Sequence, residues 1–294
     1  MPAYVLITAA KNEERYIEGT IKSVVSQTIL PLRWVIVDDG SRDGTAGIVH
    51  RWAAQYPFIR PLTVEGAAER HFGAKAAAFN RGLSLMNDLT WDFIGNVDAD
   101  VTFEPDYYER VFERFRENPK LGIAGGVIYE HIGRQFLKLP YSRDHVTGAM
   151  HLFRNGCFRD VGGYLPLKYG GIESVAEVMA RMHGWQVKSF DDIPIRHHRR
   201  IGTATRGLLA AAYRKGIMDY SHGTHPLYEM LRCLYRIGYR PVVLDSAFRA
   251  LGYASGVFRH EKRTVPPEVV KFVRKEQLRK LNIFARLAFR STTI

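Results

Sequence analysis

Short apolar runs alternate with helical patterns over the first hundred residues of this 294-residue chain. Such runs are typical of buried strands, and segments with apolar residues three and four positions apart are typical of amphipathic helices. The apolar runs are Val5–Ile7, Val35–Val37, Pro61–Val64 and Phe93–Val97. The helical patterns are Glu14–Gln27, Ile48–Tyr56 and Lys75–Met86. The alternation predicts an α/β fold with a mainly parallel sheet and helices on both of its faces.

Aspartates follow two of the predicted strands. Asp39 follows the second strand, and Asp98 and Asp100 follow the fourth. Ligands of open α/β sheets bind outside the carboxyl ends of the strands, so we expect these side chains to share one cleft. Two carboxylates separated by one residue suit a divalent cation such as Mg²⁺ or Mn²⁺, especially one that also binds a diphosphate. Aspartates in turns after strands are the ordinary alternative.

The net charge of +12 is concentrated in the last third of the chain. Residues 206–294 hold 17 lysines and arginines against 6 aspartates and glutamates, a balance of +11. Residues 1–205 hold 25 against 24, a balance of +1. This division indicates two parts with different tasks. We therefore expect one domain over residues 1–205 and a basic helical extension over residues 206–294.

The extension shows helical patterns over residues 226–239, over residues 241–258 and from Pro267 onward. On the last helix, one face is apolar and another carries Lys271, Lys275, Arg279, Arg286 and Arg290. Segment 241–258 contains Asp245 and Arg249, so we expect no membrane span, which needs about 20 largely uncharged residues. In-plane attachment to an anionic membrane surface is one hypothesis. A helical cap with a solvated basic face is the other.

The compartment is indicated by two further features. The two cysteines, Cys157 and Cys233, are too few for a disulfide framework or a cysteine metal cluster. The first residues lack the charged lead of a signal peptide. Both features favour a reduced, cytoplasmic location. The basic extension favours a peripheral position at the inner face of the cell membrane.

Ordered motifs run through roughly residues 4–200. They are Thr8–Glu14, Val35–Ser41 with Gly44-Thr45, Gly73–Gly82, Asp98-Ala99-Asp100, Gly148, Leu152–Arg154 and Val161–Tyr164. In this order and spacing they resemble the family 2 glycosyltransferases, which have the GT-A fold and use nucleoside-diphosphate sugars. The resemblance implies a GT-A catalytic domain, an inverting reaction and a Mn²⁺ or Mg²⁺ cofactor.

The resemblance also implies roles in a nucleotide cleft. Asp39 matches the position that hydrogen-bonds the nucleotide base, usually uracil, and Lys75 matches a lysine beside the nucleotide. Ala9 and Lys11 occupy cleft positions where other members carry different side chains. From the residues alone, Asp39 could be a turn or capping aspartate, although Asp43 fits that part better. Lys75 could be an ordinary solvated helix residue.

The implied metal site lies in the Asp-x-Asp motif. The resemblance implies that Asp98 faces the ribose and the metal, and that Asp100 is the direct ligand of the cation that stabilises the departing diphosphate. His197 or His198 could complete the shell, and Arg199 could hold a phosphate oxygen. Neighbouring side chains on a strand point to opposite faces, so at most one of the two histidines is expected to reach the metal. Two surface histidines in a basic turn are the alternative.

An inverting transfer also needs a general base beside the acceptor hydroxyl. In the family this is an acidic residue, often in a Glu-Asp pair, that begins a helix after the Gly-Gly-Phe/Tyr segment. Here Ser174 follows Glu173, so the second carboxylate of that pair is missing. The spacing back from Arg181-x-x-Gly184 favours Glu173, and Glu177, one turn along the same face, is the second candidate. Simple complementarity to the helix dipole is the alternative for Glu173.

Together the motifs predict transfer of a single sugar from a nucleoside-diphosphate sugar, with UDP as the expected nucleotide. The expected acceptor is a saccharide or a polyprenyl-diphosphate-linked saccharide in surface-polysaccharide assembly. The Gln-x-x-Arg-Trp signature of processive synthases does not occur in the sequence. A sugar-nucleotide nucleotidyltransferase is one alternative, but Ala9–Glu14 lacks the glycine of a triphosphate loop. A nucleic-acid-binding protein is another, but it leaves the Asp39, Lys75 and Asp98 set without a role, so we expect no nucleic-acid partner.

Overall fold

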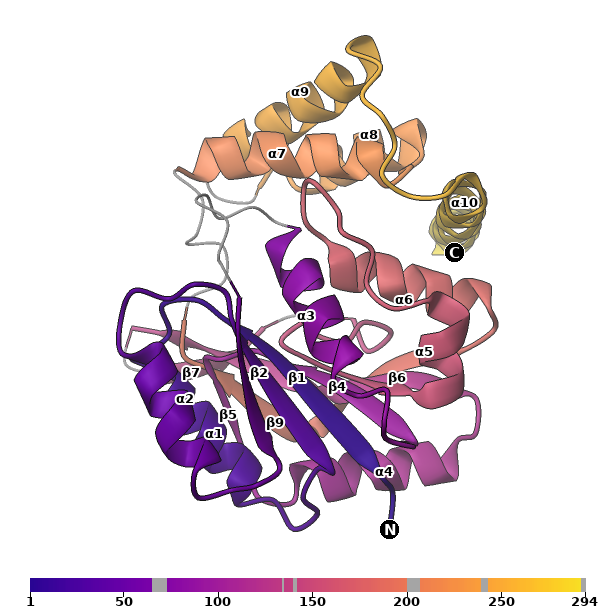
Figure 1. Cartoon of the computed structure of the whole chain (residues 1–294). Coiled ribbons are helices and arrows are strands. Elements are labelled where there is room, and N and C mark those ends of the chain that lie inside the picture. Colours follow the sequence, from indigo (N-terminus) through magenta and orange to yellow (C-terminus); the bar gives the residue numbers. More distant parts are fainter. Residues whose placement is uncertain (65–72, 134, 140–141, 200–206, 239–242, 292–294) are drawn as a thin grey trace. The chain divides into compact units, whose positions relative to one another are not determined.

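Two units divide the chain in the computed structural model, which describes residues 1–64, 73–133, 135–139, 142–199, 207–238 and 243–291, with side chains as far as residue 282 (Figure 1). Unit 1 consists of Met1–Pro166 and Ile172–Ile201. Unit 2 consists of Leu167–Gly171 and Gly202–Ile294. Each unit has its own set of secondary-structure elements.

A single mixed sheet runs through unit 1. Its strands are β1 (Tyr4–Ala10), β2 (Arg33–Asp38), β3 (Ile59–Thr63), β4 (Phe93–Val97), β5 (Val101–Phe103), β6 (Leu121–Ile132), β7 (Gln135–Lys138), β8 (Met150–Arg154) and β9 (Gln186–His197). Their order is β3-β2-β1-β4-β8-β6-β9-β5, and β7 pairs with β6. Strands β1 to β4 are parallel to their neighbours among these four, and β6 is parallel to β9, whereas β8, β7 and β5 pair antiparallel. The predicted α/β class with a mainly parallel, mixed sheet is confirmed.

Helices cover both faces of this sheet (Figure 1). They are α1 (Ile17–Val25), α2 (Thr45–Ala53), α3 (Ala74–Ser84), α4 (Tyr107–Glu117), α5 (Asn155–Val161) and α6 (Ile172–Met182). Alternate strand residues face opposite sides: Leu6 and Ile36 join a core with α1, α2 and α4. Ile7 and Val37 instead approach α3, where a Cβ on Gly82 would lie 2.8 Å from the Ile7 side chain. Burial on both faces explains why these strands are continuous apolar runs.

Local hydrogen bonds shift two of the predicted helix starts. Helix α1 begins at Ile17 rather than at Glu14, whose backbone N–H donates to Asp43 Oδ2 at 3.1 Å. Helix α2 begins at Thr45, earlier than predicted. Asp43 Oδ1 accepts from the N–H of Thr45 at 3.1 Å and from its hydroxyl at 2.5 Å, which stabilises this start. Asp43 therefore holds the turn, as the sequence suggested.

The described elements of unit 2 are helices, so the predicted helical extension is confirmed. They are α7 (Leu208–Ser221), α8 (Pro226–Tyr235), α9 (Leu244–Phe258) and α10 (Pro267–Ser291). Helix α7 was not predicted as a separate element, because Gly216 interrupts its pattern. Glycine is needed there: a Cβ on Gly216 would lie 2.0 Å from the Arg249 carbonyl oxygen of α9. A Cβ on Gly252 would lie 2.0 Å from the Tyr213 carbonyl oxygen, so α7 and α9 cross at backbone contact.

Helix α10 uses apolar side chains inside unit 2. Val269, Val270 and Val273 are buried, and a Cβ on Gly223 would lie 2.7 Å from the Val270 side chain. The side chains of Arg286 and Arg290, part of the predicted basic face, lie outside the described residues. Among the helices described, none is both long and apolar enough to cross a membrane. The thiols of the two cysteines are buried and not disulfide-bonded.

Candidate functional site

The carboxyl ends of β1 and β2 carry the first pair of predicted cleft residues. Lys11 Nζ lies 3.6 Å from Asp39 Oδ2, and both side chains are largely buried. The neighbouring Asp38 stabilises the start of this loop, because its Oδ1 accepts from the N–H of Ser41 at 2.9 Å, as Asp43 stabilises its end. Ala9 lies opposite Val37 near the end of β1 and is half-buried. The structure thus leaves the Asp39 carboxylate paired with Lys11 at the edge where ligands of such sheets bind.

Strand pairing brings a histidine to the Asp-x-Asp motif. Asp98 and Asp100 lie between β4 and β5, and β5 pairs with β9 so that Val101 is opposite His197. His197 Nε2 lies 3.3 Å from Asp100 Oδ1. One ligand atom from each of Asp98, Asp100 and His197 lies within 4.8 Å of the others. Two carboxylates and one imidazole fit a divalent cation such as Mn²⁺.

The neighbouring histidine is directed elsewhere. His198 Nε2 lies 2.8 Å from Thr102 Oγ1, and its ring stacks on Tyr16 at 6.3 Å between centroids. Its backbone N–H donates to the Asp100 carbonyl oxygen at 2.9 Å. Of the two candidate histidines, the structure therefore brings only His197 to the carboxylates.

Positive side chains balance the buried Asp100. Arg199 Nε lies 3.4 Å from Asp100 Oδ2, and Arg199 also pairs with Glu13 from the loop after β1. Burial raises the pKa of Asp100, but the hydrogen bond and charge of His197 and the charge of Arg199 outweigh it and lower the pKa overall. Burial lowers the pKa of His197, but Asp100 raises it overall. His197 and Arg199 therefore favour the ionised form of the Asp100 carboxylate, which is the form that binds a divalent cation.

Lys75 joins this cluster to the predicted base. From the first turn of α3, its Nζ lies 2.8 Å from Asp98 Oδ1 and 2.8 Å from Glu173 Oε1. It also donates to the Gly148 carbonyl oxygen at 3.0 Å. Burial lowers the pKa of Lys75, but the charges of Asp98 and Glu173 raise it well above its usual value. Lys75 is therefore a charged link across the site and not a solvated helix residue.

Glu173 lies in the first turn of α6, and its side chain is 20% exposed, so it is not fully enclosed by the protein. Gly148 makes room for it, since a Cβ there would lie 2.5 Å from the Glu173 side chain. Burial raises the pKa of Glu173, but the charge and hydrogen bond of Lys75 lower it overall. An ionised carboxylate can accept a proton, which is what a general base must do.

Glu177, the second candidate, lies inside the protein. It is 3% exposed and accepts from the N–H of Val146 at 2.7 Å. Its Oε2 lies 2.8 Å from His145 Nδ1, and its Oε1 lies 3.4 Å from His151 Nε2. Burial raises the pKa of Glu177, but the hydrogen bonds of His145 and His151 lower it to about 2. These contacts connect Glu177 to the segment that contains His145, Val146 and His151 and leave its carboxylate almost fully buried.

Several contributors were not singled out in the sequence. Asn96 donates to Asp98 Oδ1 at 3.2 Å and to the Gly148 carbonyl oxygen at 2.7 Å. The sequence could have indicated this contact, because Asn96 lies two residues before Asp98 and alternate residues of a strand face the same side. Glu13 lay within a matched motif, but its pairing with Arg199 joins residues 186 positions apart. No spacing rule predicts that contact.

Comparison with known sequences gives one family and several relatives. The model of the family described as "Glycosyl transferase family 2" matches residues 5–168. A poly-beta-1,6-N-acetyl-D-glucosamine synthase of Staphylococcus epidermidis is 24% identical over 204 residues, covering 63% of this chain and 45% of that protein. Chondroitin synthase of Escherichia coli is 29% identical over 163 residues, covering 52% of this chain and 22% of that protein. The chain spans less than half the length of these curated relatives.

Solved structures show the same fold. A mannosyltransferase from Pyrobaculum calidifontis, in complex with GDP-Man and Mn²⁺, superposes with a TM-score of 0.58 at 17% identity, covering 98% of this chain and 81% of that one. TarS of Staphylococcus aureus, in complex with UDP-GlcNAc, superposes with a TM-score of 0.57 at 15% identity, covering 81% and 73%. The GT-A fold that the motifs implied is confirmed.

Proposed function

This chain belongs to glycosyl transferase family 2, and we propose that it is an inverting, metal-dependent enzyme that transfers a single sugar from a nucleoside-diphosphate sugar. UDP is the proposed nucleotide. The observation that carries the proposal is Lys75, whose Nζ lies 2.8 Å from both Asp98 and Glu173. One ammonium group thus contacts both the proposed base and a proposed metal-binding carboxylate, which supports a single reaction site shared by the two.

We assign the donor site to the cleft edge of the sheet. Asp39 recognises the base, with Lys11 beside it and the small Ala9 leaving space, while Lys75 and Asp98 lie along the nucleotide. Asp98, Asp100 and His197 are the residues that would hold Mn²⁺ or Mg²⁺. When bound, the cation supplies charge stabilisation for the diphosphate that departs.

Arg199 is the proposed contact for a phosphate oxygen. Its guanidinium already lies beside Asp100 and Glu13. A guanidinium forms strong hydrogen bonds with phosphate. It would therefore neutralise part of the donor's charge at the same edge of the sheet.

Glu173 is the proposed base. Its carboxylate takes the proton of the acceptor hydroxyl while that oxygen forms a bond to the anomeric carbon. The bond from this carbon to the diphosphate oxygen breaks, and the nucleoside diphosphate leaves with the electron pair. Because attack and departure occur on opposite sides, the anomeric configuration inverts. Lys75 keeps Glu173 ionised before the transfer.

The acceptor and location belong to the same proposal. The curated relatives are named as synthases of polysaccharides, which supports a saccharide or polyprenyl-diphosphate-linked saccharide as acceptor in surface-polysaccharide assembly. We further propose that residues 1–205 form the catalytic domain, and that the basic residues 206–294 keep it at the inner face of an anionic cell membrane.

Thermal shift with a panel of nucleotide sugars tests the donor and the metal. We expect UDP with Mn²⁺ or Mg²⁺ to raise the Tm of the protein, and UDP-sugars to be hydrolysed slowly without acceptor. Both effects should disappear in Asp100→Ala. A metal-dependent Tm shift that survives in Asp100→Ala contradicts the metal assignment. A response to GDP alone contradicts the choice of UDP, and release of pyrophosphate from a nucleoside triphosphate and a sugar phosphate would indicate a nucleotidyltransferase.

A further inference from the structure

The outer surfaces of α8 and α9 have the reverse of the usual polarity. Over Pro226–Tyr235 and Leu244–Phe258, every exposed residue is apolar or aromatic. The large apolar side chains with the highest exposed fractions, 48% to 81%, are Met230, Leu234 and Tyr235 on α8 and Leu244, Leu251 and Phe258 on α9. A helix that meets water normally shows its charged residues there. These two helices therefore present a face that is not suited to water.

The charged side chains of the same helices point inward. Arg249 of α9 lies 2.5 Å from Asp219 of α7 and 3.1 Å from Glu229 of α8. Arg232 lies 2.8 Å from Asp219 and also pairs with Glu229. This network links three helices through buried polar groups, and such groups are stable in an apolar interior only when they are paired. Paired charges thus lie between α7, α8 and α9, whereas the outer surfaces of α8 and α9 are apolar.

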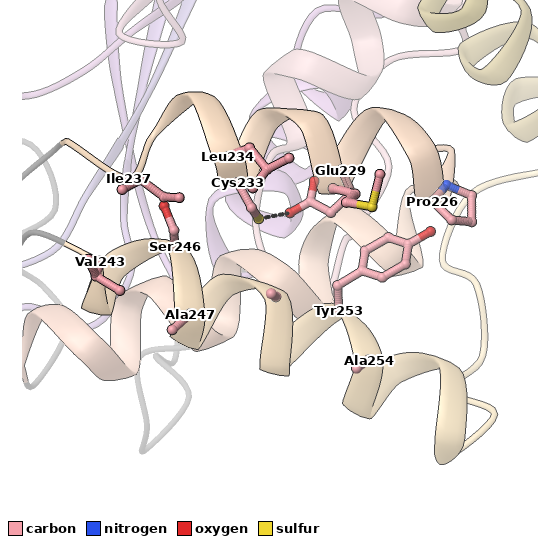
Figure 2. A pocket seen from close by; sticks show the side chains of 12 residues that line it. Pro226, Glu229, Cys233, Leu234, Ile237, Val243, Ser246, Ala247, Tyr253 and Ala254 are labelled. Carbon is pink, nitrogen blue, oxygen red and sulfur yellow. Dashed lines mark hydrogen bonds between the residues drawn. The ribbon is translucent and has the colours of Figure 1, made fainter.

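An apolar groove separates the two helices (Figure 2). The groove has a volume of about 430 Å³. Met230, Cys233 and Leu234 line it from α8, and Ala247, Ala250 and Ala254 line it from α9. The small alanines leave the space open. Three polar side chains also line the groove: Glu229, which pairs with Arg249 at 3.1 Å; Tyr253, whose hydroxyl donates to the Thr224 carbonyl oxygen at 2.7 Å; and Ser246, whose buried hydroxyl has no hydrogen-bond partner among the described residues. The other lining residues are apolar or weakly polar, so a hydrocarbon chain is a suitable occupant of this groove.

Basic residues mark both ends of this face. Tyr235 is followed by the half-buried Arg236, which pairs with Asp245 at 3.1 Å, at one end of the helix pair, and Phe258 is followed by the exposed Arg259 at the other. Aromatic rings with adjacent basic residues are typical of the membrane–water interface, where cations meet anionic headgroups. Helix α9, with 15 residues, is about 22 Å long at 1.5 Å per residue, too short to span a bilayer. The pair can instead lie in the plane of the interface.

We infer that the outer face of α8 and α9 docks into one leaflet of an anionic lipid bilayer, with lipid chains in the groove between the helices. The docking surface is therefore the α8–α9 pair and not the amphipathic α10, whose Val269, Val270 and Val273 are buried and whose Val270 packs against Gly223 of unit 2. This inference concerns unit 2 by itself. It holds whichever donor or acceptor unit 1 uses.

Co-sedimentation of the full chain with lipid vesicles tests the inference. We expect binding to vesicles of phosphatidylcholine with phosphatidylglycerol, and weaker binding to phosphatidylcholine alone. Leu234→Glu and Leu251→Glu should each lower the partition coefficient by about tenfold or more, since a carboxylate must enter the apolar layer. The matched control is Leu32→Glu in unit 1, where the leucine is 48% exposed and the change should leave binding intact. Unchanged thermal melting of each variant shows that it is folded.

Three outcomes would overturn the inference. The first is failure of the full chain to bind anionic vesicles at moderate salt. The second is binding that Leu234→Glu and Leu251→Glu leave unchanged, especially if Lys271→Ser with Lys275→Ser abolishes it, because α10 would then be the anchor. The third is a dimer in light scattering that Leu251→Glu dissociates, with no vesicle binding, because the face would then join two copies of this chain.

Discussion

Lys75 Nζ lies 2.8 Å from Glu173 Oε1, although the two residues are 98 positions apart in the sequence. The contact joins the first turn of α3 to the first turn of α6. It fixes the carboxylate that we assign as the base and lowers its pKa against the effect of burial. The protonation state of Glu173 therefore depends on one neighbouring ammonium group.

Replacing Lys75 with methionine should move the pH dependence of the reaction. Burial raises the pKa of Glu173 and Lys75 lowers it, so without Lys75 the pKa rises. The acidic limb of kcat/KM should then shift to higher pH, because the base is protonated over a wider range. Lys11→Met is the control, since it removes a cation from the cleft without touching Glu173. An acidic limb that stays in place in Lys75→Met contradicts the assignment of Glu173.

Replacement of Glu173 should reduce activity, whereas replacement of Glu177 on the same helix should reduce stability. Glu173→Gln should lower kcat by about 10²- to 10⁴-fold, the usual contribution of a general base, with little change in Tm. Glu177→Gln should lower stability, because the amide cannot replace an ion pair with His145 in a buried setting. Steady-state kinetics and thermal melting of both variants check this. Loss of kcat in a fully stable Glu177→Gln would make Glu177 the base.

Acid denaturation gives a second measure of Glu177. Its pKa falls from an ordinary 4.5 to about 2 in the folded protein, so the stabilisation is complete above pH 4.5 and disappears as the pH falls toward 2. The shift corresponds to roughly 3 kcal/mol of unfolding free energy. Chemical denaturation at several pH values should show this loss in the wild type. In Glu177→Gln that part of the pH dependence should be absent.

Removal of Asp100 should separate metal binding from nucleotide binding. Asp100→Asn should abolish the additional Tm increase that Mn²⁺ gives to UDP-bound protein, because two of the three candidate ligands remain but the most buried carboxylate is lost. Asp39→Asn should instead weaken UDP binding with or without metal. Thermal melting of UDP-bound protein with and without Mn²⁺ measures the first effect, and calorimetric titration of UDP with and without Mn²⁺ measures the second. Equal metal dependence in wild type and Asp100→Asn would refute the site.

Gly148→Ala should lower kcat only because it displaces the Glu173 carboxylate. A Cβ at residue 148 would lie 2.5 Å from the Glu173 side chain, so the carboxylate must move. We expect kcat to fall by about 10²-fold, as for a misplacement of about 1 Å, while UDP binding persists. Gly47 in α2 has open space around its Cβ position, so Gly47→Ala is the matched control. It should keep full activity and gain about 0.5–1 kcal/mol of stability.

The sheet was predictable because its signal is local. Phe93–Val97 is predicted and observed as β4 with the same bounds, since a short apolar run buried on both faces needs only its own residues to be recognised. Helix starts were less predictable. Asp43 draws α2 back to Thr45 through hydrogen bonds that also involve the loop after β1.

By itself, the sequence determined the alternating fold, the Asp-x-Asp motif at a strand end and the concentration of positive charge in the last third. Only the tertiary structure determined which of two chemically equivalent residues lies at the candidate site. The register of β5 on β9 brings His197 and not His198 to Asp100. The loop at residues 145–151 encloses Glu177 and leaves Glu173 beside Lys75. Burial of the α10 valines and exposure of α8 and α9 likewise depend on packing between distant segments, which spacing along a chain does not encode.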